Sequence, residues 1–216
     1  MILVFDASIE GFTVGVFSPQ GALIKHIENN AAYSHTELLV PTIQCVLTAS
    51  NVEFKDLTKI ITTKGPGSFT GIRVGLATAA GLRAALNIPV VAVNTLSALV
   101  HSALHHHHID KAPYIHTVLD TKCGDFYYQA FTYEQANPHS DTAPRSMSLN
   151  DIVSISKHET ILTHPSSKPT LKGVACITAP LTLMGIWNAA QSTTNDDNLQ
   201  PLYVRSANIN PPKANV

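Results

Sequence analysis

Residues 65–75 read GPGSFTGIRVG and carry the strongest local signal in the chain. They hold four glycines and one proline, follow the β-rich run KIITT and precede the helix-forming run LATAAGLRAAL. This succession predicts a strand, a tight turn and a helix. Ser68 or Thr70 is expected to cap the helix, because a hydroxyl oxygen at that place accepts a hydrogen bond from a free backbone N–H.

Three enzyme motifs come close to this stretch, and each lacks one required residue. A Walker A loop needs lysine after its last glycine, where Ile72 stands. The dinucleotide fingerprint needs a glycine where Thr70 stands. A nucleophile elbow centred on Ser68 needs glycines in the places of Pro66 and Thr70. An anion site at the helix N-terminus stays open as an alternative to a purely structural turn.

A stripe of small residues follows the turn. Gly71, Gly75 and Ala79 recur every four residues, and Leu82 continues the same helix face. Glycine inside a helix costs up to ~1 kcal/mol relative to alanine, so a compensating contact is expected. Close packing against another helix would supply it. We therefore expect Gly75→Leu to disrupt pairing between chains while leaving the fold largely intact.

The first half of the chain alternates β-rich runs with helical patterns. Its order of three strands, a helix, a strand, a helix, a strand and a helix predicts a ribonuclease-H-like lobe over residues 1–108. Ser34 and Glu37 match a capping box, and Pro41 is expected to kink the helix that follows. The strands are expected at 1–5, 12–17, 22–28, 59–63 and 88–93, and the helices at 34–50, 71–86 and 96–106.

The second half repeats the opening of the first. VFDASIEGFTVGVF (4–17) lies over VLDTKCGDFYYQAF (118–131) without a gap at an offset of 114, which places Asp6 on Asp120. Such internal duplication predicts two related α/β lobes. A shortened second lobe is expected over 109–200 and an extended tail over 201–216. Within this half we expect a polar loop at 134–146, helices at 148–156 and 181–192, and strands at 160–164 and 173–178.

Composition excludes several classes of protein. The net charge is −1 and 13% of residues are charged, with no basic cluster of the kind that a free-standing nucleic-acid binder needs. No run approaches the ~20 apolar residues of a membrane span. The three cysteines, Cys45, Cys123 and Cys176, are widely spaced and form no C-x-x-C pair, which suits a reducing compartment. These features predict a cytoplasmic protein that neither spans nor binds a membrane.

The glycine-rich stretch, with DASIEGFTVGVF, HTELLVPTIQCVL, VNTLSAL, LDTKCGDFYYQAF and PLYVR, resembles the TsaB (YeaZ-type) family. The resemblance implies an actin-like (ASKHA) two-lobe fold. It also implies a role in making N6-threonylcarbamoyladenosine at position 37 of tRNAs that read ANN codons. The implied role is that of a non-catalytic subunit without a cofactor. It would pair with its paralogue TsaD, receive the ATPase TsaE on that pair, contact tRNA indirectly, and form a homodimer when alone.

The resemblance also implies which residues serve this role. The pairing surface of the family is the two helices of the first lobe, here 34–50 and 71–86. The catalytic paralogue holds a metal on H-x-x-x-H, but Leu39 stands four places after His35, so no metal site is expected. The implied interface residues are Leu39, Ile43, Val46, Gly71, Val74, Gly75, Thr78, Ala79 and Leu82.

Two other readings remain open. Asp6, Ser8 and Asp120 stand where kinase-like relatives bind phosphate and magnesium, so an actin-like ATPase or kinase is the alternative function. Against it, the two carboxylates can equally cap tight turns, and Gly173 alone stands where ATPases carry a glycine pair. The histidines at 101 and 105–108 have spacings that zinc sites use, but a solvated helix end explains them as well. Arg73 and Arg205 are candidate contacts to a partner or to tRNA.

Overall fold

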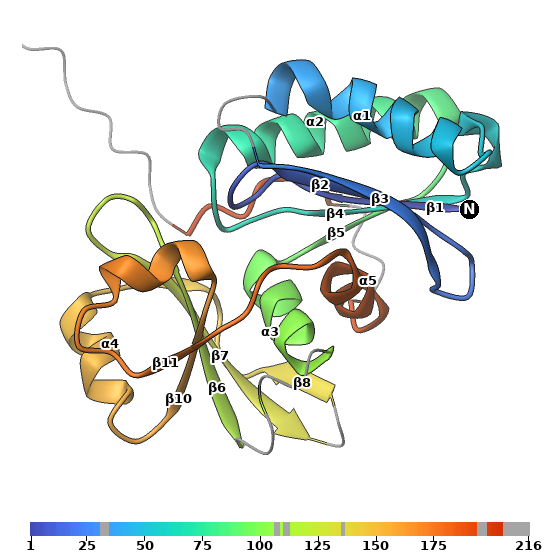
Figure 1. Cartoon of the computed structure of the whole chain (residues 1–216). Coiled ribbons are helices and arrows are strands. Elements are labelled where there is room, and N and C mark those ends of the chain that lie inside the picture. The colour runs from blue at the N-terminus through green and yellow to red at the C-terminus, as the bar shows by residue number, and fades with distance from the viewer. Residues whose placement is uncertain (31–34, 106–108, 110–112, 135–136, 194–197, 205–216) are drawn as a thin grey trace, which may run out of the picture.

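The computed structural model describes residues 1–30, 35–105, 109, 113–134, 137–193 and 198–204. These residues form two lobes, each built around one sheet (Figure 1). The first sheet has the order β3-β2-β1-β4-β5, in which β1 to β3 are antiparallel and β4 and β5 run parallel to β1. Its strands are β1 (Ile2–Asp6), β2 (Phe12–Phe17), β3 (Leu23–Asn29), β4 (Lys59–Thr63) and β5 (Val90–Val93).

The second sheet repeats this topology. Its order is β11-β10-β6-β7-β8, with β9 also paired to β7, and β10 and β11 again run parallel to the central strand β6. The predicted actin-like fold with duplicated ribonuclease-H-like lobes is therefore confirmed. The strands are β6 (Tyr114–Asp120), β7 (Phe126–Glu134), β8 (Asn137–Ser140), β9 (Arg145–Met147), β10 (Thr160–Thr163) and β11 (Cys176–Thr178).

The second lobe differs from the prediction in two details. The segment 134–146, expected as a loop, contains the short strands β8 and β9. Pro138 in β8 is tolerated because β8 lies at the edge of the sheet. The first hairpin pairs Asp6 with Thr13, whereas the second pairs Asp120 with Phe126. The second turn is thus one residue shorter, and the gapless overlay of the two halves is wrong beyond the turn.

The helices begin and end close to the predicted positions. α2 is capped by Ser68, whose hydroxyl accepts a hydrogen bond from the backbone N–H of Gly71 at 3.2 Å. α1 continues through Pro41, and the expected capping residue Ser34 lies outside the described residues. The helices are α1 (His35–Ala49), α2 (Phe69–Leu86), α3 (Thr95–His105), α4 (Leu149–Ile155) and α5 (Leu183–Gln191), with short 3₁₀ turns at Phe54–Asp56 and Pro165–Thr170.

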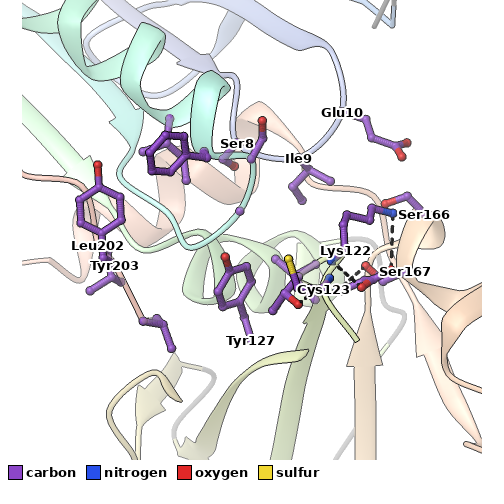
Figure 2. A pocket seen from close by; sticks show the side chains of 18 of the residues that line it. Ser8, Ile9, Glu10, Lys122, Cys123, Tyr127, Ser166, Ser167, Leu202 and Tyr203 are labelled. Atoms are coloured by element: carbon purple, nitrogen blue, oxygen red, sulfur yellow. Dashed lines mark hydrogen bonds and ion pairs between the residues drawn. The ribbon is translucent and has the colours of Figure 1, made fainter. Parts of the chain in front are cut away.

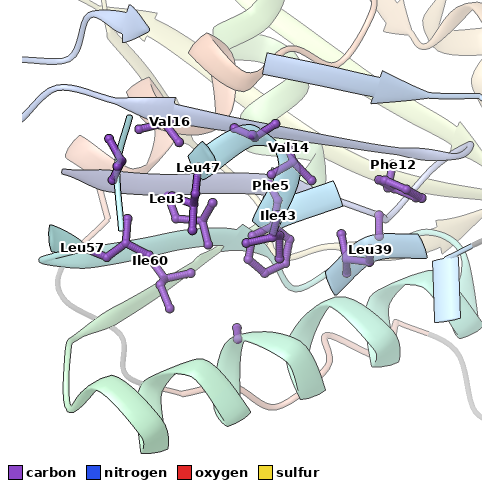
Figure 3. Packing of buried hydrophobic residues seen from close by; sticks show 14 of the residues in the cluster. Leu3, Phe5, Phe12, Val14, Val16, Leu39, Ile43, Leu47, Leu57 and Ile60 are labelled. Atoms are coloured by element: carbon purple, nitrogen blue, oxygen red, sulfur yellow. The ribbon is translucent and has the colours of Figure 1, made fainter. Parts of the chain in front are cut away.

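Helices cover both faces of the first sheet (Figure 1). α1 and α2 pack on one face around a cluster that includes Phe5 and Val14 (Figure 3). α5 packs on the opposite face, where Ile186 joins Ile2 and Val4. α5 belongs to the segment predicted as the second lobe, so the chain returns to the first lobe before residue 200. α3 contacts α5 and also packs on the second sheet, whose other face is covered by α4.

The small-residue stripe of α2 faces the chain's own sheet. A Cβ atom added to Gly75 would lie 3.8 Å from the side chains of Phe5 and Thr62. A Cβ added to Gly71 would lie 1.8 Å from the backbone oxygen of Ala7. The expectation that small residues permit close packing is thus correct, but they pack a helix on a sheet and not on another helix. Gly75→Leu would consequently damage the core of this lobe.

Most of the implied interface residues are likewise buried within the chain. Val74, Thr78 and Leu82 are half-buried. Because the buried side chains already pack inside the lobe, pairing through these helices would have to use their outward faces. The other six implied interface residues are buried: Leu39, Ile43, Val46, Gly71, Gly75 and Ala79.

In the part of the chain that the structure describes, no helix combines the length and the hydropathy that crossing a bilayer requires.

Candidate functional site

A cavity of about 630 Å³ opens between the two lobes, where the hairpin turns after β1 and β6 face each other. The glycine-rich loop, the start of α2 and the C-terminal segment 202–204 complete its walls. Figure 2 shows Tyr127 and Tyr203 on one side of this space and Lys122, Ser166 and Glu10 on the other. The remaining lining residues are Ser8, Ile9, Gly67, Ser68, Phe69, Ile72, Arg73, Leu119, Asp120, Thr121, Cys123, Ser167, Leu202 and Val204.

Asp6 lies beside this cavity but is not part of its lining. Its carboxylate is buried, with the residue 8% exposed. One oxygen, Oδ1, accepts hydrogen bonds from the backbone N–H of Ser8 at 3.0 Å, the Ser8 hydroxyl at 2.6 Å and the Thr63 hydroxyl at 2.5 Å. This arrangement is that of a turn-capping aspartate that also joins β1 to β4.

Asp120, its counterpart in the second lobe, is also engaged within the chain. Its side chain is 6% exposed and accepts a hydrogen bond from the backbone N–H of Lys122 at 2.7 Å. The Lys122 ammonium lies 3.6 Å from the other carboxylate oxygen, and the Lys122 side chain is 64% exposed. The backbone of Lys122 has φ 60°, an uncommon conformation for a residue with a side chain. The tight turn therefore places Lys122 in the lining of the cavity, paired with Asp120.

The glycine-rich loop fixes the first hairpin turn. The backbone N–H of Ser68 donates to the backbone oxygen of Ser8 at 2.6 Å. A Cβ on Gly67 would lie 2.0 Å from that same oxygen. Two backbones approach here more closely than any side chain allows, which is one established use of glycine. Close packing of the two backbones therefore explains the glycine at position 67.

An exposed cluster of aromatic rings and one cation borders the cavity. The Nε–H of Arg73 donates to the Tyr203 hydroxyl at 2.9 Å, and the Arg73 guanidinium lies 3.7 Å from the centroid of the Phe69 ring. The backbone N–H of Leu202 donates to the backbone oxygen of Lys64 at 2.8 Å. Together these contacts fasten the C-terminal segment along the glycine-rich loop.

His164 stands at the second-lobe side of the site. Its Nδ1 accepts from the backbone N–H of Ser166 at 3.3 Å and lies 2.8 Å from the Ser166 hydroxyl. Because a backbone N–H can only donate, Nδ1 is an acceptor, and the hydroxyl proton of Ser166 points to it. Burial lowers the pKa of His164, an effect that nearby Glu10 and Asp6 partly oppose.

The histidines whose spacing leaves a zinc site open are described only in part. No group of three or more His, Cys, Asp or Glu side chains able to hold a metal occurs among the described residues. His101 is 7% exposed, and burial lowers its pKa to about 4. His106–His108 and Arg205 lie outside the described residues, as does the side chain of His35.

The sequence pattern pointed to Asp6, Ser8 and Asp120, and two of these, Ser8 and Asp120, line the cavity. It did not indicate Phe69, Tyr127, Ser166 or Tyr203, which come from four separate segments. Phe69 lies within the glycine-rich stretch, so the sequence could have indicated this residue as part of the site. The other three meet it only through the lobe arrangement.

Comparison with known proteins gives the family. Residues 27–160 match the family model described as TsaD: tRNA N6-adenosine threonylcarbamoyltransferase, which is more than half of the chain. A protein from Buchnera aphidicola subsp. Schizaphis graminum (strain Sg), named tRNA threonylcarbamoyladenosine biosynthesis protein TsaB, is 33% identical over 128 residues, 59% of each chain. The protein of that name from Escherichia coli (strain K12) is 28% identical over 134 residues, 62% of this chain and 56% of the relative.

The matched segment thus spans less than two thirds of the length of these relatives. Among solved structures, an uncharacterized protein with similarity to peptidase YEAZ from Pseudomonas aeruginosa has a TM-score of 0.78 at 18% identity, over 94% of this chain and 99% of that chain. The structural match covers nearly the whole chain and therefore includes both lobes. The chain belongs to the family whose model matches residues 27–160, described as TsaD: tRNA N6-adenosine threonylcarbamoyltransferase, and the curated relatives that it matches are of the TsaB type.

Proposed function

We propose that this protein is a non-catalytic subunit of the machinery that makes N6-threonylcarbamoyladenosine in tRNA, and that it acts by pairing with a TsaD paralogue. Membership of the TsaB type supports the pathway, since the relatives are named for biosynthesis of this nucleoside. The observation that carries the pairing is an exposed, apolar face shared by α1 and α2, the two helices on the outer side of the first lobe (Figure 1).

On α2 this face consists of the smallest side chains. Ala77, Ala80, Gly81 and Ala84 are exposed and follow the i, i+3, i+4, i+7 spacing of one helix face. A Cβ added to Gly81 would meet nothing within 4 Å. Small side chains let a partner helix approach closely, because the distance between helix axes depends on the side chains at the contact.

On α1 the outward residues are larger. Leu38 is 41% exposed and Val40 is 51% exposed, and Cys45 is exposed beyond them. Leu38 and Cys45 are seven residues apart and share one face of α1, whereas Val40, two residues after Leu38, lies on another side of the helix. Exposed apolar side chains that lie together commonly mark a protein–protein interface. We define the α1–α2 outer face as Leu38 and Cys45 of α1 and the four small residues of α2. It replaces the buried residues first expected at the interface and continues the half-buried Val74, Thr78 and Leu82.

The two carboxylates at the cavity support a role in which this protein does not catalyse phosphoryl transfer. An actin-like ATPase would need carboxylates free to hold magnesium, yet Asp6 Oδ1 accepts three hydrogen bonds within the chain and the Asp120 carboxylate is paired with Lys122. Replacement of those internal partners by a metal would cost their hydrogen bonds. The accessory role therefore fits this site better than the kinase or ATPase alternative.

The finer features of the proposal follow the family resemblance. They are adenosine 37 of ANN-reading tRNAs as the modified nucleoside, TsaE as an ATPase that docks on the pair, and a cytoplasmic homodimer when TsaD is absent. Indirect contact with tRNA agrees with the net charge of −1. The carboxylates Asp6 and Asp120 remain in this proposal as a relic of a nucleotide site.

The α1–α2 outer face is tested by one charged substitution. Ala80→Arg should weaken binding to TsaD of the same organism at least ~10-fold in a titration, because a desolvated, unpaired charge costs several kcal/mol at an interface. Ala143, on the second lobe, is also exposed; Ala143→Arg is the matched control and should bind normally. Equal affinity of Ala80→Arg and the unsubstituted chain would place the interface elsewhere.

A further inference from the structure

We propose that Arg73 determines which partner pairs with the α1–α2 outer face, and that it receives a carboxylate side chain of the TsaD paralogue. This inference rests on the proposed pairing and adds the chemistry that the partner must offer. Arg73 precedes Ala77 by four residues and Ala80 by seven, so it lies on the exposed face of α2 that these alanines form. A helix that covers the alanines therefore also covers Arg73.

The guanidinium of Arg73 is held in place by two neighbouring rings. Its Nε–H donates to the Tyr203 hydroxyl at 2.9 Å, and its central carbon lies 3.7 Å from the centroid of the Phe69 ring. Phe69 stands one turn before Arg73 on α2, whereas Tyr203 belongs to the C-terminal segment. We call these three residues the Arg73 cluster. A guanidinium fixed in this way loses little conformational freedom when it binds a further group.

The edge of this guanidinium opposite Nε carries two NH₂ groups. Arginine has five N–H donors, and the contact with Tyr203 uses one of them. No carboxylate of a described residue forms an ion pair with Arg73. Two parallel N–H groups match the two oxygens of a carboxylate and form a bidentate pair. The Arg73 cluster is thus complementary in charge and shape to an aspartate or glutamate side chain.

Pairing makes such a carboxylate necessary. Phe69 and Tyr203 are 52% and 53% exposed, so the cluster stands at the surface until a partner covers it. The small residues that follow Arg73 on α2 let a partner helix approach closely, which removes water from the guanidinium. A cation that is covered and left unpaired weakens binding, whereas a charge pair favours the partner that completes it. The partner that fits this face brings an acidic side chain to the Phe69 end of α2.

A second copy of this chain is less suited to Arg73. The sequence of α2 contains no Asp or Glu, and that of α1 contains Glu37 alone. Glu37 lies in the first turn of α1, where its carboxylate already interacts favourably with the helix N-terminus. A homodimer formed through these helices has this one carboxylate for Arg73. A paralogue with an acidic residue in the right place is therefore preferred to a second copy.

Titration of the full chain with TsaD of the same organism tests the inference. Arg73→Gln should weaken binding at least ~10-fold, since hydrogen bonds to a charged group are lost. Arg73→Lys should recover only part of the affinity, because lysine keeps the charge but lacks the bidentate fork. Higher ionic strength should weaken the unsubstituted pair more than the Arg73→Gln pair. The fold is retained, because Arg73 is exposed and glutamine favours a helix nearly as well.

Arg145 provides a matched control. It is also exposed and also lies over an aromatic ring, that of Tyr128 at 5.1 Å, but it belongs to β9 of the second lobe. Arg145→Gln should bind TsaD as the unsubstituted chain does.

The outcomes separate this inference from the proposed function. Normal TsaD binding by Arg73→Gln, together with weakened binding by Ala80→Arg, would overturn the inference and leave the pairing face in place. Normal binding by both variants would overturn the pairing face as well. Loss of the homodimer in Arg73→Gln with unchanged affinity for TsaD would also overturn the inference, in favour of a contact with Glu37 of a second copy.

Discussion

Two glycines on α2, Gly71 and Gly75, are one helical turn apart and are glycine for different reasons. At Gly71 the backbone oxygen of Ala7 occupies the space of a Cβ, at 1.8 Å. At Gly75 the nearest atoms lie at 3.8–3.9 Å, an ordinary van der Waals distance. Only glycine fits at position 71, because the hairpin turn occupies the space of a side chain. At position 75 there is room for one methyl group.

This difference gives a prediction for stability. Gly75→Ala should stabilise the protein by about 0.5–1 kcal/mol, because alanine favours the helix and its methyl group fits. Gly71→Ala should destabilise it by ~1–3 kcal/mol, as overpacking does, despite the same gain in helix propensity. Chemical denaturation of both variants measures the two free energies. Equal effects of the two substitutions would show that α2 does not approach Ala7 as closely as described.

His101 makes stability depend on pH. It lies buried on α3, its Nε2 has no hydrogen-bond partner among the described residues, and burial lowers its pKa to about 4 from 6.5. The unfolded chain therefore binds a proton at a higher pH than the folded chain does. Above pH 6.5 the free energy of unfolding is not reduced by His101. As pH falls from 6.5 towards 4, protonation of this histidine in the unfolded chain lowers the free energy of unfolding by about 3 kcal/mol in all.

Replacement of this residue tests the assignment. His101→Leu should lose less stability than the unsubstituted chain between pH 7 and pH 4, as followed by denaturant unfolding at a series of pH values. Burial also lowers the pKa of His116 and of His164, so some acid sensitivity remains in the variant. His26→Leu, at an exposed position on β3, is the control. Identical pH profiles for His101→Leu and the unsubstituted chain would contradict the role given to His101.

At the scale of elements, the regular segments could be predicted because hydrophobic periodicity and caps mark them. α2 ends at the predicted Leu86 and begins two residues before the predicted start, with Ser68 as its cap. The direction of its glycine stripe could not be predicted, because small residues suit a helix that packs on a sheet as well as one that packs on a helix. β8 and β9 were missed because their four and three residues carry no apolar alternation and depend on pairing with β7.

The candidate site was partly predictable for a related reason. The repeated strand–Asp–turn pattern placed Asp6 and Asp120 at corresponding ends of two strands, and the two sheets confirm that correspondence. The internal partners of the two carboxylates include Thr63 for Asp6 and Lys122 for Asp120. The aromatic side of the cavity depends on Tyr203, which reaches α2 from the far end of the chain. Such long-range contacts leave no local pattern in the sequence.

At the scale of the whole molecule, the lobes are joined through more than the covalent chain. α5 returns to the first sheet, where Trp187 stacks on Phe17 with ring centroids 5.1 Å apart. Asn94, which precedes α3, donates a hydrogen bond to Gln129 of β7 at 2.7 Å. These contacts hold the two lobes together within one chain. The α1–α2 outer face remains exposed among the described residues, and the proposal assigns pairing to it.

The central claim is that this protein works by pairing through α1 and α2. Light scattering during gel filtration, on the protein alone and mixed with TsaD of the same organism, tests it most directly. We predict a species of twice the 23.2 kDa chain mass for the protein alone, which TsaD converts into a one-to-one heterodimer. A single-chain mass that TsaD leaves unchanged would contradict the claim.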